Sequence, residues 1–488
     1  MKFVRKLLSD AVVYSLTPLV SALVGFLLVP IYTRTFTPSD YGALALVNTT
    51  TSLAAILVIC GLDNSTAIWF WEHPEPEERK RTFSTWMAFT VGCSALIAVV
   101  AVALHKQLAR LVLEQENLSV AWLLFAANLL AINVSRIGIV WFRMHRTPWP
   151  AVLLGGLMSI GSAAFGVFFV LRLHLGVPGV IGGQAAGAWL AGVVTFVALR
   201  KVFKPRYVDT ARLKPMLRLS APLVVILHLN WLMGGAVNYF VSYWCSRADA
   251  GIYQVANSLA GVLGLVIFAF DQAWAPTALA IRDVDVAKRV YGVTVETVFV
   301  LGLLLAFAAA AFGRPVLMIV TQPVYASGEW VLGLLATNTV LTNIPSVLSV
   351  TFAREKVTVP LLKATAIGAP FTLVLLRPAT LWLGKEGAAL SVVIGTIVIA
   401  SFTFRYSQRV FPIDIDVRRS GLATAIVAGF LALLVITRPF VAMSVGGMIA
   451  HATVLVVALG TCVGLLYRRA LRAAWAEARR PAVTPADT

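Results

Sequence analysis

Long apolar segments alternate along this chain with short polar connections. A membrane-spanning helix needs about 20 consecutive apolar residues, and fourteen segments meet that length. They lie at residues 11–33, 42–70, 84–104, 119–141, 150–171, 177–199, 219–244, 251–280, 291–312, 328–352, 358–377, 387–404, 420–437 and 443–466. No connection is long enough to form a soluble domain. The pattern therefore predicts an all-α polytopic membrane protein with about fourteen transmembrane helices.

The composition supports this fold class and argues against several kinds of function. Hydrophobic residues make up 59% of the chain and charged residues 13%, whereas a globular domain carries about 25% charged residues. The amino end has no short apolar region with a small-residue cleavage site, so we interpret it as the first span and not as a signal peptide. The four cysteines lack metal-ligand spacing, and we find no glycine-rich phosphate loop and no nucleophile triad. We therefore expect no metal, no cofactor and no catalytic residue.

The positions of the basic residues predict the topology. With the amino end in the cytoplasm, 30 of the 40 basic residues fall on the cytoplasmic side. This asymmetry follows the positive-inside rule and favours a multi-pass protein of a bacterial inner membrane with both termini cytoplasmic. The formal net charge of +18 is then explained by topology and by attraction to anionic lipid headgroups, with no need for a nucleic-acid partner.

An internal repeat divides the chain. Asp40-Tyr41-Gly42 and Asn48 open the second segment, and Asp249-Ala250-Gly251 and Asn257 open the eighth at a constant offset of 209 residues. Because each half has six helices, the repeat is parallel, with a pseudo-twofold axis along the membrane normal. We predict an N-lobe (1–199), a basic cytoplasmic linker (200–218), a C-lobe (219–410), two extra helices (411–467) and a basic tail (468–488).

Several short motifs carry a family resemblance. They are Leu28-Val29-Pro30-Ile31-Tyr32-Thr33-Arg34 with Asp40-Tyr41-Gly42, then Gly61-Leu62-Asp63, Ala250-Gly251-Ile252-Tyr253 and Gln272-Ala273-Trp274-Ala275-Pro276. With these motifs the chain resembles the polysaccharide-transporter branch of the multidrug/oligosaccharidyl-lipid/polysaccharide (MOP) exporter superfamily, the Wzx-type flippases. Members with the Gly-Leu-Asp motif often carry an arginine about five residues later in the same helix. Here that position is Ile68.

The resemblance implies a function. A polyprenyl (undecaprenyl)-pyrophosphate-linked oligosaccharide would move from the cytoplasmic to the periplasmic leaflet by alternating access, for O-antigen (lipopolysaccharide), capsule or exopolysaccharide synthesis. Whether a proton or sodium gradient drives it stays open. The protein would be a monomer, with other polysaccharide assembly proteins as possible partners.

Charged residues inside spans need partners or water. Asp63 and Arg136 lie at similar depth from the predicted cytoplasmic ends of their helices, so we predict that they pair, which replaces the arginine missing at Ile68. A purely structural tie between the second and fourth helices is the alternative. Arg34, Arg136 and Arg377 could together bind headgroup phosphate along the path, although Arg34 and Arg377 could instead anchor their helices at the outer headgroups.

Two further sets of candidates concern coupling and sugar binding. The coupling-ion candidates are Asp63, Asp271 and Glu296, for each of which a structural role is the alternative. The polar candidates for lining a cavity are Asn48, Asn128, Asn257 and His228, which could bond sugar hydroxyls or simply join helices.

Three other functions are weighed against the flippase. Two belong to the same superfamily, a lipid II-type peptidoglycan-precursor flippase and a drug/cation antiporter. The distant alternative is an enzyme, either a polysaccharide polymerase or a glycosyltransferase. Such enzymes place acidic or basic residues on sizeable outer loops, and the longest outer connections here are 105–118 and 313–327.

Overall fold

The computed structural model describes residues 2–73, 75–355, 357, 359–440 and 444–478, and all regular structure in these residues is helical. Helices prevail because a backbone in lipid must satisfy its own hydrogen bonds. The N-lobe contains α1 (Lys2–Thr35), α2 (Pro38–Ile59), α3 (Leu62–Glu72), α4 (Pro76–Ala103), α5 (His105–Leu113), α6 (Val120–Met144), α7 (Pro148–Leu171) and α8 (Gly176–Leu199). The C-lobe contains α9 (Thr210–Gly234), α10 (Val237–Trp244), α11 (Arg247–Ala280), α12 (Val284–Val320), α13 (Glu329–Arg354), α14 (Val359–Leu383) and α15 (Lys385–Val410), and α16 (Val417–Thr437) and α17 (Val445–Ala478) follow it.

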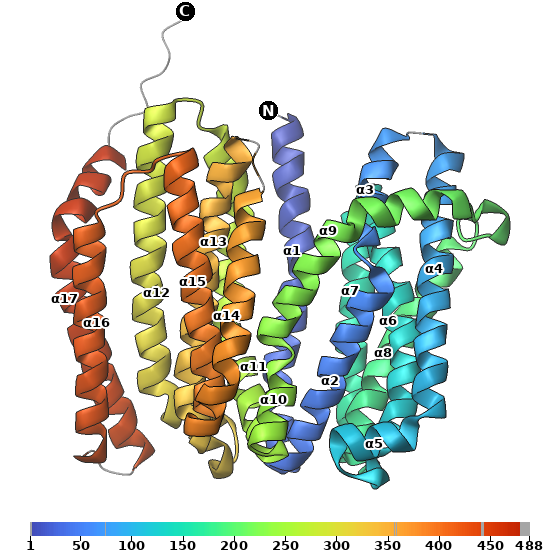
Figure 1. Ribbon diagram of the computed structural model, residues 1–488, viewed down its shortest axis with the longest axis horizontal. Helices are drawn as coiled ribbons and strands as arrows, with labels where there is room; N and C mark the ends of the chain where they lie inside the picture. The colour runs from blue at the N-terminus through green and yellow to red at the C-terminus, as the bar shows by residue number, and fades with distance from the viewer. Residues whose placement is uncertain (1, 74, 356, 358, 441–443, 479–488) are drawn as a thin grey trace, which may run out of the picture.

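The helices stand side by side and define two edges of the bundle (Figure 1). Helix α1 begins and α17 ends at the same edge, which we call the basic edge because the predicted cytoplasmic loops lie there. Helices α2 and α11 begin at the other, which we call the motif edge. In the described residues, 13 helical segments are long and apolar enough to cross a membrane. The eighth predicted span, 251–280, lies within α11, a helix of 34 residues, so the structure agrees with about fourteen spans.

The two motif glycines meet where α2 crosses α11. A Cβ atom added to Gly42 would lie 2.0 Å from the carbonyl oxygen of Arg247, and one added to Gly251 would lie 1.9 Å from that of Pro38. Gly251 follows Gly42 by 209 residues and Arg247 follows Pro38 by the same 209. The contact is therefore reciprocal, as at an interface between two copies related by a twofold axis.

The same offset also relates the caps of these helices. Thr37 caps α2 and forms a capping box with Asp40, while Ser246 caps α11 and its hydroxyl accepts a hydrogen bond from the amide of Asp249. The motif aspartates therefore sit in the first turn of each helix, where a carboxylate is stabilised by free amides and by the helix dipole. Their recurrence is explained by helix initiation.

Additional hydrogen bonds join the lobes at the motif edge. Gln322 donates from Nε2 to the carbonyl oxygen of Arg34 over 2.9 Å, and the Tyr325 hydroxyl donates to that of Phe36 over 3.0 Å. Both donors lie in or beside η3 (Pro323–Gly328), which precedes α13. Side chains from both lobes form one continuous buried cluster with the α2–α11 crossing. The lobes are thus closed against each other at this edge.

Two spans that were predicted as single helices are each built from two. The span predicted at 42–70 is interrupted at Cys60 and Gly61, which both adopt left-handed backbone with φ of 47° and 66°. The span predicted at 219–244 is interrupted between Gly234 and Val237, where α9 ends and α10 begins. Consecutive left-handed residues cannot continue a right-handed helix, so the prediction of one continuous helix is wrong for 42–70. It is also wrong for 219–244, where α9 and α10 are separate helices.

The seventh span, α9 and α10, runs along α2 of the other lobe. The Ser220 hydroxyl donates to the carbonyl oxygen of Gly61 over 2.9 Å, and the Trp231 indole donates to the Ser52 hydroxyl over 3.1 Å. Before α9, the predicted linker packs on α4, since the amide of Asp209 donates to Thr85 over 2.9 Å. A hydrogen bond from Arg212 lowers the pKa of Asp209. The first turns of α9 are therefore fastened to the N-lobe.

The last two helices lie at the periphery, beside α12 and beyond the C-lobe (Figure 1). In the most apolar stretch of each helix, only 11% of the residues of α16 and 22% of those of α17 are buried inside the protein. The predicted basic tail from residue 468 is helical as far as Ala478 and is continuous with α17. The remainder of that tail, residues 479–488, lies outside the described residues.

Candidate functional site

A cavity with several polar groups in its wall lies in the N-lobe, where that lobe meets α9 and α11. One part has a volume of about 530 Å³ and the adjoining part about 300 Å³. The two parts share four lining residues, Asn48, Ser159, Ser162 and Gln184. Helices α2, α6, α7 and α8 supply most of the wall of the larger part, together with Asp63 of α3 and Leu227 of α9. The smaller part is lined by α1, α2, α7 and α8, together with Gln254 and Ser258 of α11. Concave sites with a few convergent polar groups in an apolar wall are typical of ligand binding.

An ion pair lies in the wall of the larger part. Arg136 of α6 and Asp63 of α3 approach to 2.8 Å between Nη2 and Oδ2, so the predicted pair forms. Asp63 is the second residue of α3, two positions after the left-handed Gly61. This position favours a carboxylate, because the amides at a helix start carry partial positive charge. The Arg136 side chain is 51% exposed and that of Asp63 is 23% exposed, which leaves donors of the guanidinium available to the cavity.

Two predicted asparagines lie in the same wall. Asn48 is exposed on α2, and Asn128 is only 3% exposed on α6. Sequence reasoning missed their companions Ser159, Ser162 and Gln184. The Ser159 hydroxyl lies 2.6 Å from that of Ser21, and Ser162 donates to the carbonyl oxygen of Gln184 over 3.3 Å. The signal that could have found them is the helical spacing of isolated polar residues in an otherwise apolar segment.

Asp271 occupies a separate polar site in the C-lobe, between α11 and α13. Its two carboxylate oxygens accept hydrogen bonds from Asn343 Nδ2 over 3.1 Å and from Ser346 Oγ over 3.0 Å. Within the described residues no basic side chain forms an ion pair with Asp271. Asp63 has a cationic partner, and Asp271 has only neutral donors, although the two residues occupy similar positions in the repeat.

The other predicted residues do not line the N-lobe cavity. Glu296 faces Arg419 of α16, with 4.0 Å between Oε1 and Nη1. His228 Nδ1 lies 2.7 Å from the carbonyl oxygen of Val224 in its own helix, and Asn257 is exposed on α11. Arg34 and Arg377 are exposed and line neither part of the cavity. The structure therefore brings together Asp63, Arg136, Asn48 and Asn128.

The donor set of this site suits a polar organic ligand better than a metal ion. Among the described residues no group of three or more His, Cys, Asp or Glu side chains could hold a metal. The cavity instead offers one guanidinium, one carboxylate, hydroxyls and amides. Guanidinium groups bind phosphate oxygens bidentately, and amides and hydroxyls both donate and accept hydrogen bonds.

Comparison with known structures extends over most of the chain. The lipid II flippase MurJ in an inward closed conformation has a TM-score of 0.70 at 14% sequence identity, covering 94% of this chain and 100% of that chain. An inward-facing multidrug resistance MATE family transporter of the MOP superfamily has a TM-score of 0.66 at 17% identity, with 80% and 94% covered. The Vibrio cholerae MATE transporter VcmN in the bent form has a TM-score of 0.55 at 14% identity, with 86% and 98% covered. At these identities the likeness shows the fold.

Comparison at the level of sequence assigns the family. No curated protein matches the chain at a significant level. The model of the family described as "polysaccharide biosynthesis protein" matches residues 7–281. This match includes the N-lobe, its cavity and the whole α2–α11 crossing. Because it extends over more than half of the chain, this protein belongs to the polysaccharide biosynthesis protein family, with the fold of the MOP transporters.

Proposed function

We propose that this protein is a flippase that moves a polyprenyl-pyrophosphate-linked oligosaccharide repeat unit from the cytoplasmic to the outer leaflet of the bacterial inner membrane. The observation that carries this proposal is the N-lobe cavity with Arg136 and Asp63 in its wall, in a chain of the polysaccharide biosynthesis family. The basic edge is then cytoplasmic. The same lipid-linked substrate would serve O-antigen, capsule or exopolysaccharide synthesis.

The chemistry of the cavity suits the head of such a substrate. Pyrophosphate is anionic, and Arg136 presents guanidinium donors to the cavity although it also binds Asp63. Asn48, Ser159 and Gln184 offer donors and acceptors that match sugar hydroxyls. Closure of the lobes at the motif edge supports loading from the basic edge, followed by opening at the motif edge. Rocking of two halves about a fixed site is the usual form of alternating access.

Complementation tests the proposal directly. Expression in a strain that lacks its repeat-unit flippase is expected to restore surface polysaccharide and to remove the accumulated lipid-linked oligosaccharide from the inner leaflet. The Arg172→Gln variant is the matched control for later arginine variants, because Arg172 is exposed at the end of α7 and lies outside the cavity. Persistent accumulation in spite of normal membrane expression would contradict the proposal.

A lipid II-type flippase is the second candidate, because the fold of MurJ covers 94% of this chain. The two candidates differ in the sugar and peptide that follow the pyrophosphate, so one protein is not expected to replace both. Rescue of a strain depleted of its lipid II flippase, without rescue of the repeat-unit strain, would favour this second function. The drug/cation antiporter would show neither rescue.

Asp271→Asn is expected to abolish any dependence of transport on a proton or sodium gradient while the protein still folds. The asparagine can keep hydrogen bonds with Asn343 and Ser346, but it cannot carry or release a charge. The measurement is transport in vesicles with imposed gradients. Glu296→Gln is the comparison variant, because Glu296 faces Arg419 at the α12–α16 interface. Unchanged gradient dependence in Asp271→Asn would exclude Asp271 as the coupling site.

A further inference from the structure

A second pocket lies at the motif edge, between the C-lobe and the peripheral helices. Its volume is about 230 Å³, and residues of α12, α16, η4 (Arg438–Phe440) and α17 line it. Its wall combines apolar and cationic side chains, which are Ala311, Arg314, Pro315, Leu434, Val435, Arg438, Pro439, Met448 and His451. This pocket is separate from the N-lobe cavity, with which it shares no residue.

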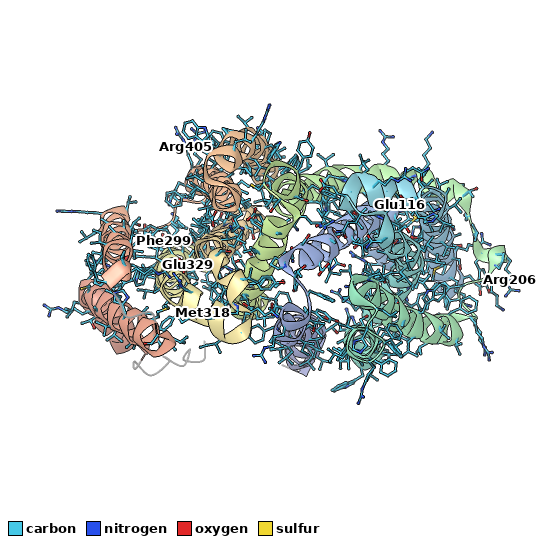
Figure 2. The ribbon with its side chains drawn as sticks, turned by 90° about the horizontal axis from the view of Figure 1, so that it is seen from below. Glu116, Arg206, Phe299, Met318, Glu329 and Arg405 are labelled. Atoms are coloured by element: carbon cyan, nitrogen blue, oxygen red, sulfur yellow. The ribbon has the colours of Figure 1, made fainter. Side chains whose placement is uncertain are left out.

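The polar end of the pocket has an excess of positive charge. Arg438 and Arg314 approach the same carboxylate, that of Glu329, at 3.2 Å and 3.9 Å. Glu329 lies on the side of the C-lobe that faces α16 and α17 (Figure 2). A further carboxylate, that of Glu386, lies 3.7 Å from Lys385, which also approaches Asp249 to 3.0 Å. Two guanidinium groups thus share one carboxylate, and His451 closes the pocket with Nε2 2.8 Å from the Thr437 hydroxyl.

Arg438 is fixed by its neighbours, and its guanidinium keeps N–H donors that form no hydrogen bond. Its guanidinium lies 4.8 Å from the centre of the Trp330 ring, and its side chain is 17% exposed. Within the described part of the chain, Nη2 of Arg438 is buried without a hydrogen bond. Nη1 of Arg438 and Nε of Arg314 face the Glu329 carboxylate, but neither forms a hydrogen bond of good geometry with it, and Glu329 Oε2 is likewise left without a hydrogen bond. A guanidinium in such a position favours an anionic ligand with several acceptor oxygens.

The surroundings of the pocket indicate a lipid ligand. Leu422, Leu431, Leu433 and Ile436 of α16 are 50%, 40%, 42% and 64% exposed, so an exposed apolar surface extends along α16 from the cationic end. Helix α16 ends at Thr437, which places Arg438 at the level where a bilayer changes from acyl chains to headgroups. Charge at one end and an exposed apolar strip at the other match a phospholipid with an anionic headgroup.

We infer that this pocket binds the phosphate of an anionic phospholipid from the leaflet at the motif edge, with the acyl chains lying along α16. The lipid neutralises the excess cationic charge of Arg314 and Arg438 and joins the two peripheral helices to the C-lobe. This site goes beyond the proposed transport function, since it involves neither the N-lobe cavity nor its charge pair.

Native mass spectrometry of the full-length protein in detergent tests the inference. With dioleoyl phosphatidylglycerol as probe, one tightly bound lipid is expected, and phosphatidylcholine is expected to bind more weakly. Arg438→Gln is expected to weaken phosphatidylglycerol binding about fivefold, the effect of one arginine near an anionic headgroup. Arg172→Gln removes an equal charge from an exposed position at the end of α7 and is expected to change nothing.

A double variant controls for misfolding, and inorganic phosphate controls for binding of the phosphate group alone. If Arg438→Gln folds poorly because Glu329 loses its nearer partner, the double variant Arg438→Gln/Glu329→Gln removes one charge of each sign and keeps the net charge of the cluster. It is still expected to bind the lipid more weakly, because the guanidinium donors of Arg438 are absent. Inorganic phosphate is added in a separate experiment. Equal loss of lipid in Arg172→Gln, unchanged binding in Arg438→Gln and in the double variant, or displacement of the lipid by inorganic phosphate alone would each overturn the inference.

Discussion

Gly251→Ala is expected to destabilise the protein by about 3 kcal/mol, near the top of the usual range for overpacking, and to abolish transport. The new Cβ atom would lie 1.9 Å from the carbonyl oxygen of Pro38. That neighbour is backbone within the first turn of a helix, so no side chain can rotate away. The lobes would have to separate at the motif edge. Thermal unfolding of the purified variant and complementation of a flippase-deficient strain measure the two effects.

Gly261→Ala is the matched control in the same helix. Nothing lies within 4 Å of a Cβ atom at this position, and alanine favours helix over glycine by about 1 kcal/mol. This variant is therefore expected to be neutral or slightly more stable. If Gly251→Ala resembled Gly261→Ala in both measurements, the close crossing of α2 and α11 would not be required.

Arg136→Gln is expected to reduce transport at least about tenfold, because loss of one partner leaves the Asp63 carboxylate uncompensated in the membrane. Loss of the ion pair should cost about 2 kcal/mol of stabilising free energy. This value is at the lower end for paired charges because the Arg136 side chain is half exposed to the cavity. The exchanged pair, Asp63→Arg with Arg136→Asp, is expected to recover part of the activity. Recovery stays partial because an arginine at the start of α3 opposes the helix dipole.

A surface ion pair provides the control for this experiment. Arg110 and Glu116 approach to 2.9 Å, and their side chains are 66% and 47% exposed. Exposed pairs contribute about 0–1 kcal/mol, so Arg110→Gln should transport normally. If the exchanged pair restores nothing that the single variants lose, the mutual attraction of Asp63 and Arg136 is not what transport requires.

The sequence was sufficient to predict the number and approximate positions of the spans, the repeat and the charge pair, but not the breaks within two of the spans. The spans are predicted from the length of the apolar segments. The Asp63–Arg136 pair is predicted from the similar depth of the two residues in the membrane, because opposite charges within spans are stabilised by pairing. The repeat was recognised from Asp40, Gly42 and their counterparts Asp249 and Gly251. The physical reason for these residues, capping by the aspartates and close crossing by the glycines, needed the three-dimensional arrangement.

Other features could not be predicted because they depend on contacts between distant segments. Cys60 adopts a left-handed conformation that its residue type disfavours, and the neighbouring Gly61 is held by Ser220, which lies far along the chain. Ser159 and Gln184 face a common cavity only once α7 and α8 are packed. Glu296 was a candidate for coupling by depth, but it faces α16, whose position the spacing of apolar residues does not reveal.

The interruption at Cys60 and Gly61 divides the second span into two helices, α2 and α3, which need not move as one rigid body. Rotation at one end of a continuous helix also rotates its other end. Two left-handed residues interrupt the helical hydrogen bonds, so the helices on either side can change their relative orientation. Helix α2 is anchored through Gly42 to the start of α11, and the break itself is anchored through Gly61 to Ser220 of α9. If transport proceeds by the proposed rocking of the lobes, this break allows α2 to turn without twisting α3, and the Asp63–Arg136 contact is kept while the wall beside it moves.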